Sequence, residues 1–197
     1  TMKKILKPKG KIIIEVQYFP KMLKNFTFDN IYHEHVNYWS MQALNKFCKL
    51  NDLKIFKVEE IDTHGGSIRV YITKEKKIKI ASSVNKILKK ESDIGILDDQ
   101  IFSNYGKKIE NLNKNLKVNL SKLNKKYKLV VGYGAPAKAS TVINFAGITK
   151  KDIKFIIDDN KLKKNKFIPG TDIKIVSKKN VKKIDCIIVF AWNFYSD

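Results

Sequence analysis

Arginine and histidine are scarce in this sequence, although positive charge is abundant. Among 40 lysine and arginine residues only Arg69 is an arginine, and the chain has 3 histidines. Proteins that bind nucleic acid usually mix arginine with lysine, because arginine pairs bidentately with phosphate and guanine. The lysines are also spread along the chain. We therefore interpret the formal charge of +21 as solvated lysine-rich faces, with a general attraction to phosphate-bearing ligands and no nucleic-acid partner.

Cysteine and long apolar runs are also lacking. The 2 cysteines, Cys48 and Cys186, lie far apart in apolar stretches. This pattern predicts free thiols in a reducing compartment and argues against a disulfide or a zinc site. No apolar run approaches the length of a membrane span, and no signal peptide opens the chain. The sequence thus predicts a cytoplasmic protein with no membrane contact; it carries no signal of oligomeric state.

Neither end of the sequence resembles a natural terminus. Residues 1–6 begin as if inside a helix, which Pro8 and Gly10 would close, and residues 192–197 directly follow a buried-looking strand. We expect the sequence to be a piece of a longer protein.

The first third of the chain predicts one helix among three strands. A β-branched run indicates a strand, an aromatic and histidine-rich stretch an ordered loop, and Ser40 can cap a helix. Two more strands follow, joined by a turn at Gly65-Gly66. In order, these elements are the strand 11–18, the loop 25–38, the helix 41–51 and the strands 53–60 and 67–73. This order matches the last part of a class I methyltransferase sheet, a doubly wound parallel sheet that ends in an antiparallel edge.

The rest of the chain predicts a helical bridge and a second α/β unit. Residues 80–126 are charged and carry an apolar stripe at helical spacing. Ser82 or Ser83 can cap one helix here and Asp98 another. Strand, glycine turn, helix and further strands then follow, as in a small Rossmann-like parallel-sheet domain. The predicted fold is α/β, with boundaries at residues 1–78, 79–126 and 127–197.

Tyr32-His33-Glu34-His35 holds two of the three histidines. His-x-His can begin a metal site, but Cys48 and Cys186 are in apolar surroundings, so we predict no metal here. Histidines satisfied in a polar core are a second interpretation. The third is proton transfer, with an imidazole base, a supporting carboxylate and a tyrosine hydroxyl near developing charge. An extended stretch would pair His33 with His35 on one face, whereas a helical turn would make Tyr32 and His35 neighbours.

The turn from Gly132 through Gly134 to Ala137 has the G-x-G-x-x-A spacing of a phosphate-binding loop between a strand and a helix. Asp158 ends the next strand, where a ribose-binding carboxylate would stand. Three interpretations remain open: a dinucleotide site, a site for the phosphate of another ligand, and a tight turn that needs glycine only for packing. Proline at position 136 removes one backbone donor.

A third stretch runs from His64 through Gly65 and Gly66 to Arg69. Paired glycines permit positive φ or a close backbone approach, and a hairpin turn explains them equally well. A hairpin does not explain why the only arginine lies here. We interpret Arg69 as a fixed pairing site, either internal or to a ligand, and His64 with the two glycines as residues that shape the site.

Taken in order, these motifs resemble the sugar C-methyltransferases, which act on nucleotide-linked keto-deoxysugars. The resemblance covers nearly the whole chain. It is carried by YHEH with Tyr38 and Ser40, THGGSIRVY at 63–71, GYGAPAK at 132–138, Asp158 with Pro169-Gly170-Thr171, and Trp192-Asn193.

The resemblance implies a division of labour within a longer protein. The family has a zinc-binding N-terminal domain, a domain that binds S-adenosyl-L-methionine, and a C-terminal Rossmann-like domain that holds the nucleotide sugar. This chain resembles the end of the second and most of the third. The cysteine zinc motif and the glycine-rich cofactor loop are not in the sequence, so zinc is expected only in the N-terminal domain, the cofactor site mostly outside this chain, and this piece alone inactive.

The resemblance also implies roles for single residues. His35 matches the base that removes the proton α to the sugar ketone, Tyr32 would orient the sugar or steady the oxyanion, and Glu34 would support them. Lys138 at the start of its helix is the candidate for the pyrophosphate. The remaining candidate substrate-binding residues are Gly132, Gly134, His33 and Asp158. The alternative function is a nucleotide-sugar or dinucleotide binding module without chemistry of its own.

Overall fold

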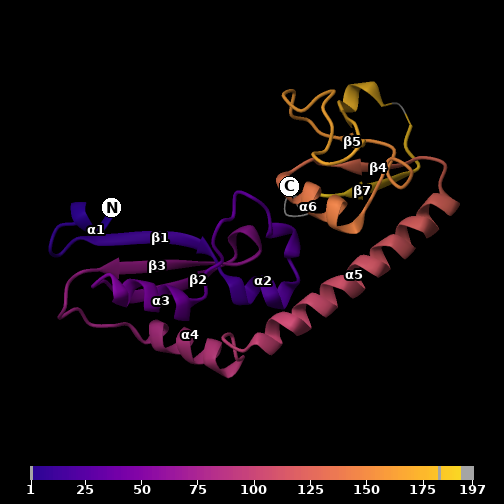
Figure 1. The fold of residues 1–197 in the computed structure, drawn as a ribbon. Coiled ribbons are helices and arrows are strands. Elements are labelled where there is room, and N and C mark those ends of the chain that lie inside the picture. Colours follow the sequence, from indigo (N-terminus) through magenta and orange to yellow (C-terminus); the bar gives the residue numbers. More distant parts are fainter. Residues whose placement is uncertain (1, 182, 192–197) are drawn as a thin grey trace. The chain divides into compact units, whose positions relative to one another are not determined.

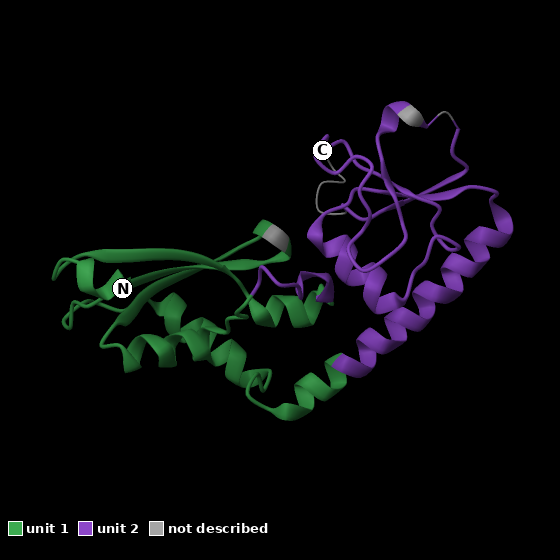
Figure 2. Cartoon of the chain, turned by 45° about the horizontal axis from the view of Figure 1, so that its top comes forward, with its two compact units in different colours: residues 1–27, 36–105 green, residues 28–35, 106–197 purple. Residues whose placement is uncertain are grey.

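The protein is an α/β chain that divides into two compact units. The computed structural model describes residues 2–181 and 183–191. Unit 1 consists of Thr1–Thr27 and Val36–Tyr105, and unit 2 consists of Phe28–His35 and Gly106–Asp197 (Figure 2). The Trp192-Asn193 motif lies outside the described residues. The short segment Phe28–His35 thus belongs to unit 2, although its chain neighbours on both sides belong to unit 1.

Unit 1 is built on a three-stranded antiparallel sheet. Its strands are β1 (Lys11–Gln17), β2 (Lys54–Ile61) and β3 (Ser67–Thr73), in the order β1-β3-β2 (Figure 1). The central strand β3 is antiparallel to both neighbours, with Glu15 opposite Arg69 on one side and Glu59 opposite Arg69 on the other. Ile68, Val70 and Ile72 of β3 are buried. These strands lie within one residue of their predicted positions.

Helices α3 (Met41–Leu50) and α4 (Ser82–Asp93) pack against β2 and against each other. Ser40 caps α3 as predicted, since its Oγ accepts from Ala43 N at 3.1 Å. A second cap comes from α4, because the fully buried Glu91 carboxylate accepts from Met41 N at 2.6 Å and from Gln42 N at 2.8 Å. Burial, and after it the neighbouring Glu91 carboxylate, raise the pKa of the Tyr18 hydroxyl. The shorter helices of unit 1 are α1 (Met2–Ile5) and α2 (Phe19–Asn25).

The helical region after β3 has the predicted elements, with one difference at its start. The cap of α4 is Ala81, with no side-chain hydrogen bond, so neither Ser82 nor Ser83 caps it. Both serines are instead the first residues of the helix. The long helix α5 (Asp99–Lys126) follows, and the carboxylate of Asp98 accepts from Gln100 N at 2.9 Å, as expected of a cap.

Unit 2 contains a four-stranded parallel sheet. The strands β4 (Val130–Tyr133), β5 (Ile156–Ile157), β6 (Ile175–Val176) and β7 (Cys186–Val189) run in the order β6-β5-β4-β7. Helix α6 (Ala137–Ala146) follows the glycine turn after β4. Its Ala139 and Ile143 join a core with Ile153, Ile156 and Ile173. The predicted small parallel-sheet unit is confirmed, and the domain boundaries proposed from the sequence remain a prediction.

Within the described residues, the short 3-10 helices are η1 (Phe28–Asn30), η2 (Thr63–Gly65) and η3 (Lys178–Asn180). Across residues 2–181 and 183–191, none of the helices combines the length and apolar character needed to cross a membrane. The same residues contain no cluster of three or more histidine, cysteine, aspartate or glutamate side chains placed to hold a metal ion.

Candidate functional site

The histidine-rich segment Phe28–His35 lies along helix α6 of unit 2. The rings of Phe28 and Phe145 lie 5.3 Å apart, near the C-terminal end of the helix. About one turn nearer the N-terminus of α6, the Thr141 hydroxyl donates to the carbonyl oxygen of Ile31 at 3.3 Å. The segment therefore runs antiparallel to α6 and brings Tyr32 and His33 toward the N-terminal end of that helix.

Tyr32 and His35 face each other across one turn. The amide of His35 donates to the carbonyl oxygen of Tyr32 at 2.9 Å, which closes the turn. The ring centroids lie 4.4 Å apart, and the Tyr32 hydroxyl is 3.3 Å from His35 Nε2. Of the two geometries that the sequence left open, the chain adopts the helical turn, in which Tyr32 and His35 are neighbours.

The imidazole of His35 is fixed by a backbone group. Its Nδ1 lies 2.8 Å from the carbonyl oxygen of Asn30, a residue with no exposed surface. A carbonyl can only accept, so we assign the ring proton to Nδ1. Nε2 then carries the lone pair and faces Tyr32. A neutral imidazole held in this way is arranged to accept a proton at Nε2.

His33 and Glu34 are exposed on the same turn. His33 contributes with Tyr32 to the wall of a cavity of about 320 Å³ in unit 2. The opposite walls come from the start of α6 and from the segment between β5 and β6. The other lining residues are Ala135, Pro136, Ala137, Ser140, Thr141, Lys163, Lys166, Phe167, Ile168, Pro169 and Ile175.

The polar groups of this cavity suit a phosphorylated ligand. Helix N-termini attract anions through their free amides, and α6 opens at the cavity wall with Ala137. Lys163 and Lys166 add positive charge, while Ser140 and Thr141 add hydroxyls. Tyr32, His33 and Phe167 offer flat rings at the same cavity. The cavity could therefore hold a ligand that combines an anion with a ring.

Gly132 in β4 and Gly134 in the turn after it are each packed closely against a neighbouring segment. A Cβ on Gly132 would lie 2.7 Å from Ile156 Cγ1, and one on Gly134 would lie 2.7 Å from the Cβ of Ala191. Gly134 also has φ of 83°, which disfavours any side chain. Among the three interpretations of this turn, these contacts favour packing. Direct ligand contact by Gly132 or Gly134 stays a prediction.

The Asp158 carboxylate is engaged by groups of its own unit. It accepts from Ala135 N at 2.7 Å and from Asn160 N at 2.8 Å, and its Oδ2 lies 3.4 Å from Lys163 Nζ. Lys163 also donates to the carbonyl oxygen of Ala135 at 2.9 Å. Asp158 thus ties the glycine turn to the segment after β5, which carries two of the cavity lysines. Its predicted contact with the substrate remains untested.

Lys138 is buried behind the cavity wall. Its residue is 8% exposed, and it is not among the residues that line the cavity. Burial lowers the pKa of the Lys138 ammonium, while the negative charge of Asp29 acts in the opposite direction. Asp29 is itself 7% exposed. Lys138 therefore does not line this cavity, and its contact with a pyrophosphate stays a prediction.

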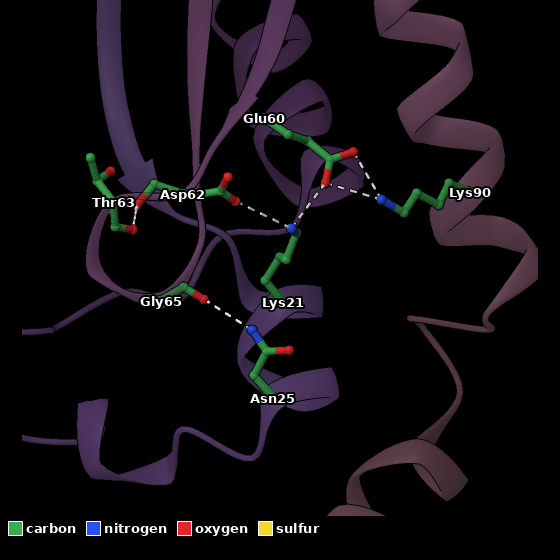
Figure 3. A network of polar contacts seen from close by, with 8 residues as sticks. Lys21, Asn25, Glu60, Asp62, Thr63, Gly65 and Lys90 are labelled. Atoms are coloured by element: carbon green, nitrogen blue, oxygen red, sulfur yellow. Dashed lines mark hydrogen bonds and ion pairs between the residues drawn. The ribbon is translucent and has the colours of Figure 1, made fainter. Parts of the chain in front are cut away.

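The Gly65-Gly66 turn and Arg69 belong to unit 1. Gly66 has φ of 120°, and a Cβ there would lie 2.8 Å from the Lys21 Cβ. Figure 3 shows how α2 holds this turn: Asn25 donates to Gly65 O at 3.2 Å, and Lys21 Nζ lies 3.7 Å from Asp62. The ammonium of Lys90 is 2.8 Å from the Glu60 carboxylate in the same network.

Arg69 pairs internally with Glu15 of the adjacent strand. Its guanidinium donates to Glu15 Oε2 at 3.0 Å, and this bond is the main reason that its pKa is raised. Thr63 donates to the other oxygen of the same carboxylate at 3.0 Å. The pair thus joins β1 and β3 to the turn, which fits a site-shaping role. The side chain of His64 lies outside the described part of the structure.

Several residues of this site carry no signal in the sequence. Asn30 acts through its backbone carbonyl, and Asp29, Thr141 and Lys166 stand outside the motifs that the sequence analysis singled out. The tertiary arrangement alone brings them to the histidine-rich segment or the cavity.

Comparison with known proteins adds two findings. A family model described as the C-methyltransferase C-terminal domain matches residues 62–197. The chain is also 30% identical over 193 residues to a protein of Streptomyces niveus named C-methyltransferase NovU. That alignment covers 96% of this chain and 46% of the relative, so the chain spans about half the length of the curated relative it matches.

Proposed function

The chain belongs to the family defined by the C-methyltransferase C-terminal domain, and from that premise we propose that it is part of an enzyme that methylates a carbon atom of a nucleotide-linked keto-sugar. The single observation that carries the chemical part of the proposal is the Tyr32–His35 pair. The Nε2 lone pair of His35 lies 3.3 Å from the Tyr32 hydroxyl, and Tyr32 also lines a cavity that could hold a ligand with an anion and a ring.

In the proposed reaction His35 is the base. Nε2 takes the proton from the carbon next to the ketone, and the electron pair of the broken C–H bond forms the enolate of the sugar. The Tyr32 hydroxyl, no longer needed by Nε2, donates to the enolate oxygen and stabilises its charge. S-adenosyl-L-methionine supplies an electrophilic methyl group to such a carbon nucleophile. Glu34, exposed on the same turn, is a polar supporting group.

We propose that the nucleotide sugar occupies the cavity of unit 2. The diphosphate would meet the N-terminus of α6 and the ammonium groups of Lys163 and Lys166, because anions bind where free amides and cations converge. His33 and Tyr32 would contact the part of the ligand nearest the base. Gly132, Gly134 and Asp158 would act on the ligand through the shape of the turn that they hold.

We propose further that the β1-β3-β2 sheet is the end of a class I methyltransferase sheet. In support, β1 and β2 run parallel to each other with the antiparallel β3 between them. Among the described residues, the Gly65-Gly66 turn after β2 packs against Lys21, and the glycine turn after β4 is filled by side chains of its own unit. The residues present therefore do not fit S-adenosyl-L-methionine, whose site is proposed to lie mostly outside this chain. By the family resemblance, zinc is proposed only for an N-terminal domain outside this chain.

The test replaces His35 in the full-length protein. His35→Ala should lower turnover of a thymidine-diphosphate keto-deoxysugar by roughly 10²–10⁴-fold, the usual contribution of a positioned base. Binding of S-adenosyl-L-methionine, measured by calorimetry, should stay the same. Unchanged turnover would remove His35 as the base. Nucleotide-sugar binding without any turnover by the native protein would favour a binding module without chemistry of its own.

A further inference from the structure

We infer that Asn144 is a positioning residue for the nucleotide: its side chain ties one wall of the unit 2 cavity to helix α6. Residues 167–169 form this wall, which is called the 167–169 wall below. The inference rests on the proposed function for the identity of the ligand, and its structural part concerns unit 2 alone. It gives a role to the Pro169-Gly170-Thr171 motif, which the proposed reaction does not use.

The first step is the character of the wall. Phe167, Ile168 and Pro169 line the cavity with apolar groups, and Phe167 is 54% exposed. Ser140 and Thr141 line it from α6 with hydroxyls. An exposed aromatic ring at a cavity offers a face on which a flat heterocycle can stack. The 167–169 wall thus suits the base of a nucleotide, while the start of α6 suits its phosphates.

The second step is the attachment of this wall. Asn144 lies on α6, about one turn after Ser140, and does not line the cavity. Its Nδ2 donates to the carbonyl oxygen of Ser140 at 2.8 Å and to that of Pro169 at 2.9 Å. The two bonds use both hydrogens of the amide group. The amide therefore joins a residue of one cavity wall to a residue of the other.

The third step is the turn that follows Pro169. Gly170 has φ of 77°, and a Cβ there would lie 2.5 Å from Asn144 Oδ1. Thr171 closes the turn, since its amide and its hydroxyl both donate to the carbonyl oxygen of Ile168 at 3.0 Å. Bonds within the turn thus set its shape, and glycine lets it approach the Asn144 amide closely. The bond from Asn144 fixes its position relative to α6.

The test compares Asn144→Ala with Asn124→Ala in the full-length protein. Asn124 is the matched control, because it is also exposed and makes the same two kinds of bond from helix α5. Its Nδ2 donates to the carbonyl oxygen of Leu120, about one turn earlier, at 3.0 Å and to that of Asp152 at 2.9 Å. Neither Asn124 nor Asp152 lines the cavity. A loss of stability alone should therefore affect both variants alike.

The first readout is the Kd of thymidine diphosphate, measured by calorimetry. The second is hydrogen–deuterium exchange of the amides of residues 166–173, followed by mass spectrometry, which needs no ligand. We expect Asn144→Ala to raise the Kd by about 3–10-fold, as for the loss of one hydrogen bond, and to speed the exchange. KM for a thymidine-diphosphate keto-deoxysugar should rise with the Kd, while kcat changes little. Asn124→Ala should change none of these quantities.

A double variant tests whether Asn144 acts through the 167–169 wall. Phe167→Ala removes the ring on which the base would stack, so it should raise the Kd at least as much as Asn144→Ala. Once that ring is absent, its position no longer matters. Asn144→Ala should therefore add little to the Kd of Phe167→Ala in the double variant.

Three results would overturn the inference. The first is a native Kd in Asn144→Ala, whatever its exchange rates. The second is an equal rise of the Kd in Asn144→Ala and Asn124→Ala, which would make the effect one of stability. The third is full additivity in the double variant, which would separate Asn144 from the wall. Failure of the proposed reaction is distinguishable, because it would show as full turnover in His35→Ala whatever the Kd values.

Discussion

His35 directs its Nδ1 atom at the backbone carbonyl oxygen of Asn30, 2.8 Å away, and so leaves Nε2 to face the Tyr32 hydroxyl. This hydrogen bond gives the two ring nitrogens different roles. One is committed to holding the ring, and the other is available for proton transfer. A backbone acceptor suits this purpose, because no side-chain rotation can remove it.

Tyr32→Phe tests the other member of the pair. The change removes the hydroxyl that would stabilise the enolate oxygen and keeps the aromatic ring. Turnover in the full-length protein should fall by about 10²–10³-fold, as for the loss of one oxyanion donor, with KM for the nucleotide sugar changed far less. Tyr127→Phe, a half-buried tyrosine at the end of α5, is the matched control and should retain full turnover. Equal turnover of both variants would exclude a chemical role for Tyr32.

Glu91→Gln tests the buried cap of α3. The substitution keeps the shape but removes the charge that accepts from Met41 N and Gln42 N. Hydrogen bonds to a charged acceptor are stronger than those to a neutral one, so the free energy of unfolding should fall by about 1–3 kcal/mol. Urea denaturation followed by circular dichroism would measure the change. Glu110→Gln, an exposed glutamate on α5, should leave the midpoint unchanged. An unshifted midpoint for Glu91→Gln would mean that Ser40 alone is a sufficient cap.

Gly134→Ala tests whether the glycine turn is built for packing. A methyl group there would lie 2.7 Å from the Cβ of Ala191 at φ of 83°, so we expect a loss of about 1–3 kcal/mol in unfolding free energy. Gly106→Ala provides the opposite case, because nothing lies within 4 Å of an added Cβ in the helix α5. That variant should gain about 0.5–1 kcal/mol. A neutral Gly134→Ala would contradict the packing explanation.

The two free thiols should differ in reactivity. Cys48 is buried in unit 1, and burial raises the pKa of its thiol to about 11, whereas Cys186 on β7 is half-buried. At pH 8 iodoacetamide should label Cys186 well before Cys48, as mass spectrometry of the native protein would show. Faster labelling of Cys48 would contradict its burial.

The raised pKa of the Cys48 thiol also predicts that the protein loses stability as the pH rises above about 8.5. The unfolded thiol ionises near pH 8.5, while the folded one stays protonated to about 11. Its contribution is therefore fully present below about pH 8.5 and is lost as the pH rises from there to about 11. Replacing Cys48 by alanine should flatten this part of the stability profile.

The elements of this fold could be predicted because their signals are local. The β-branched run of β1 and the Ser40 cap of α3 depend on neighbours in the sequence. The same is true of the turn that begins at Gly132. Such patterns fix strands and helices whatever surrounds them, so the observed bounds lie close to the predicted ones for most elements.

The geometry of the site could not be predicted in the same way. The sequence allowed either an extended stretch or a helical turn at Tyr32 to His35, and only the contacts of Asn30 and His35 decide between them. Lys138 stands where a phosphate-binding lysine would stand, yet it is buried and does not line the cavity. Asp158 matches the position of a ribose ligand, but its carboxylate holds Ala135 N and Asn160 N. Tertiary partners decide each of these cases.

The central claim, that His35 removes the proton next to the sugar ketone, can be measured without methyl transfer. The full-length protein would be incubated in D₂O with a thymidine-diphosphate keto-deoxysugar and S-adenosylhomocysteine, and deuterium at the carbon next to the ketone followed by NMR. The account predicts exchange catalysed by the native protein and lost in His35→Ala, with nucleotide-sugar binding retained. Exchange at the native rate in His35→Ala would contradict it.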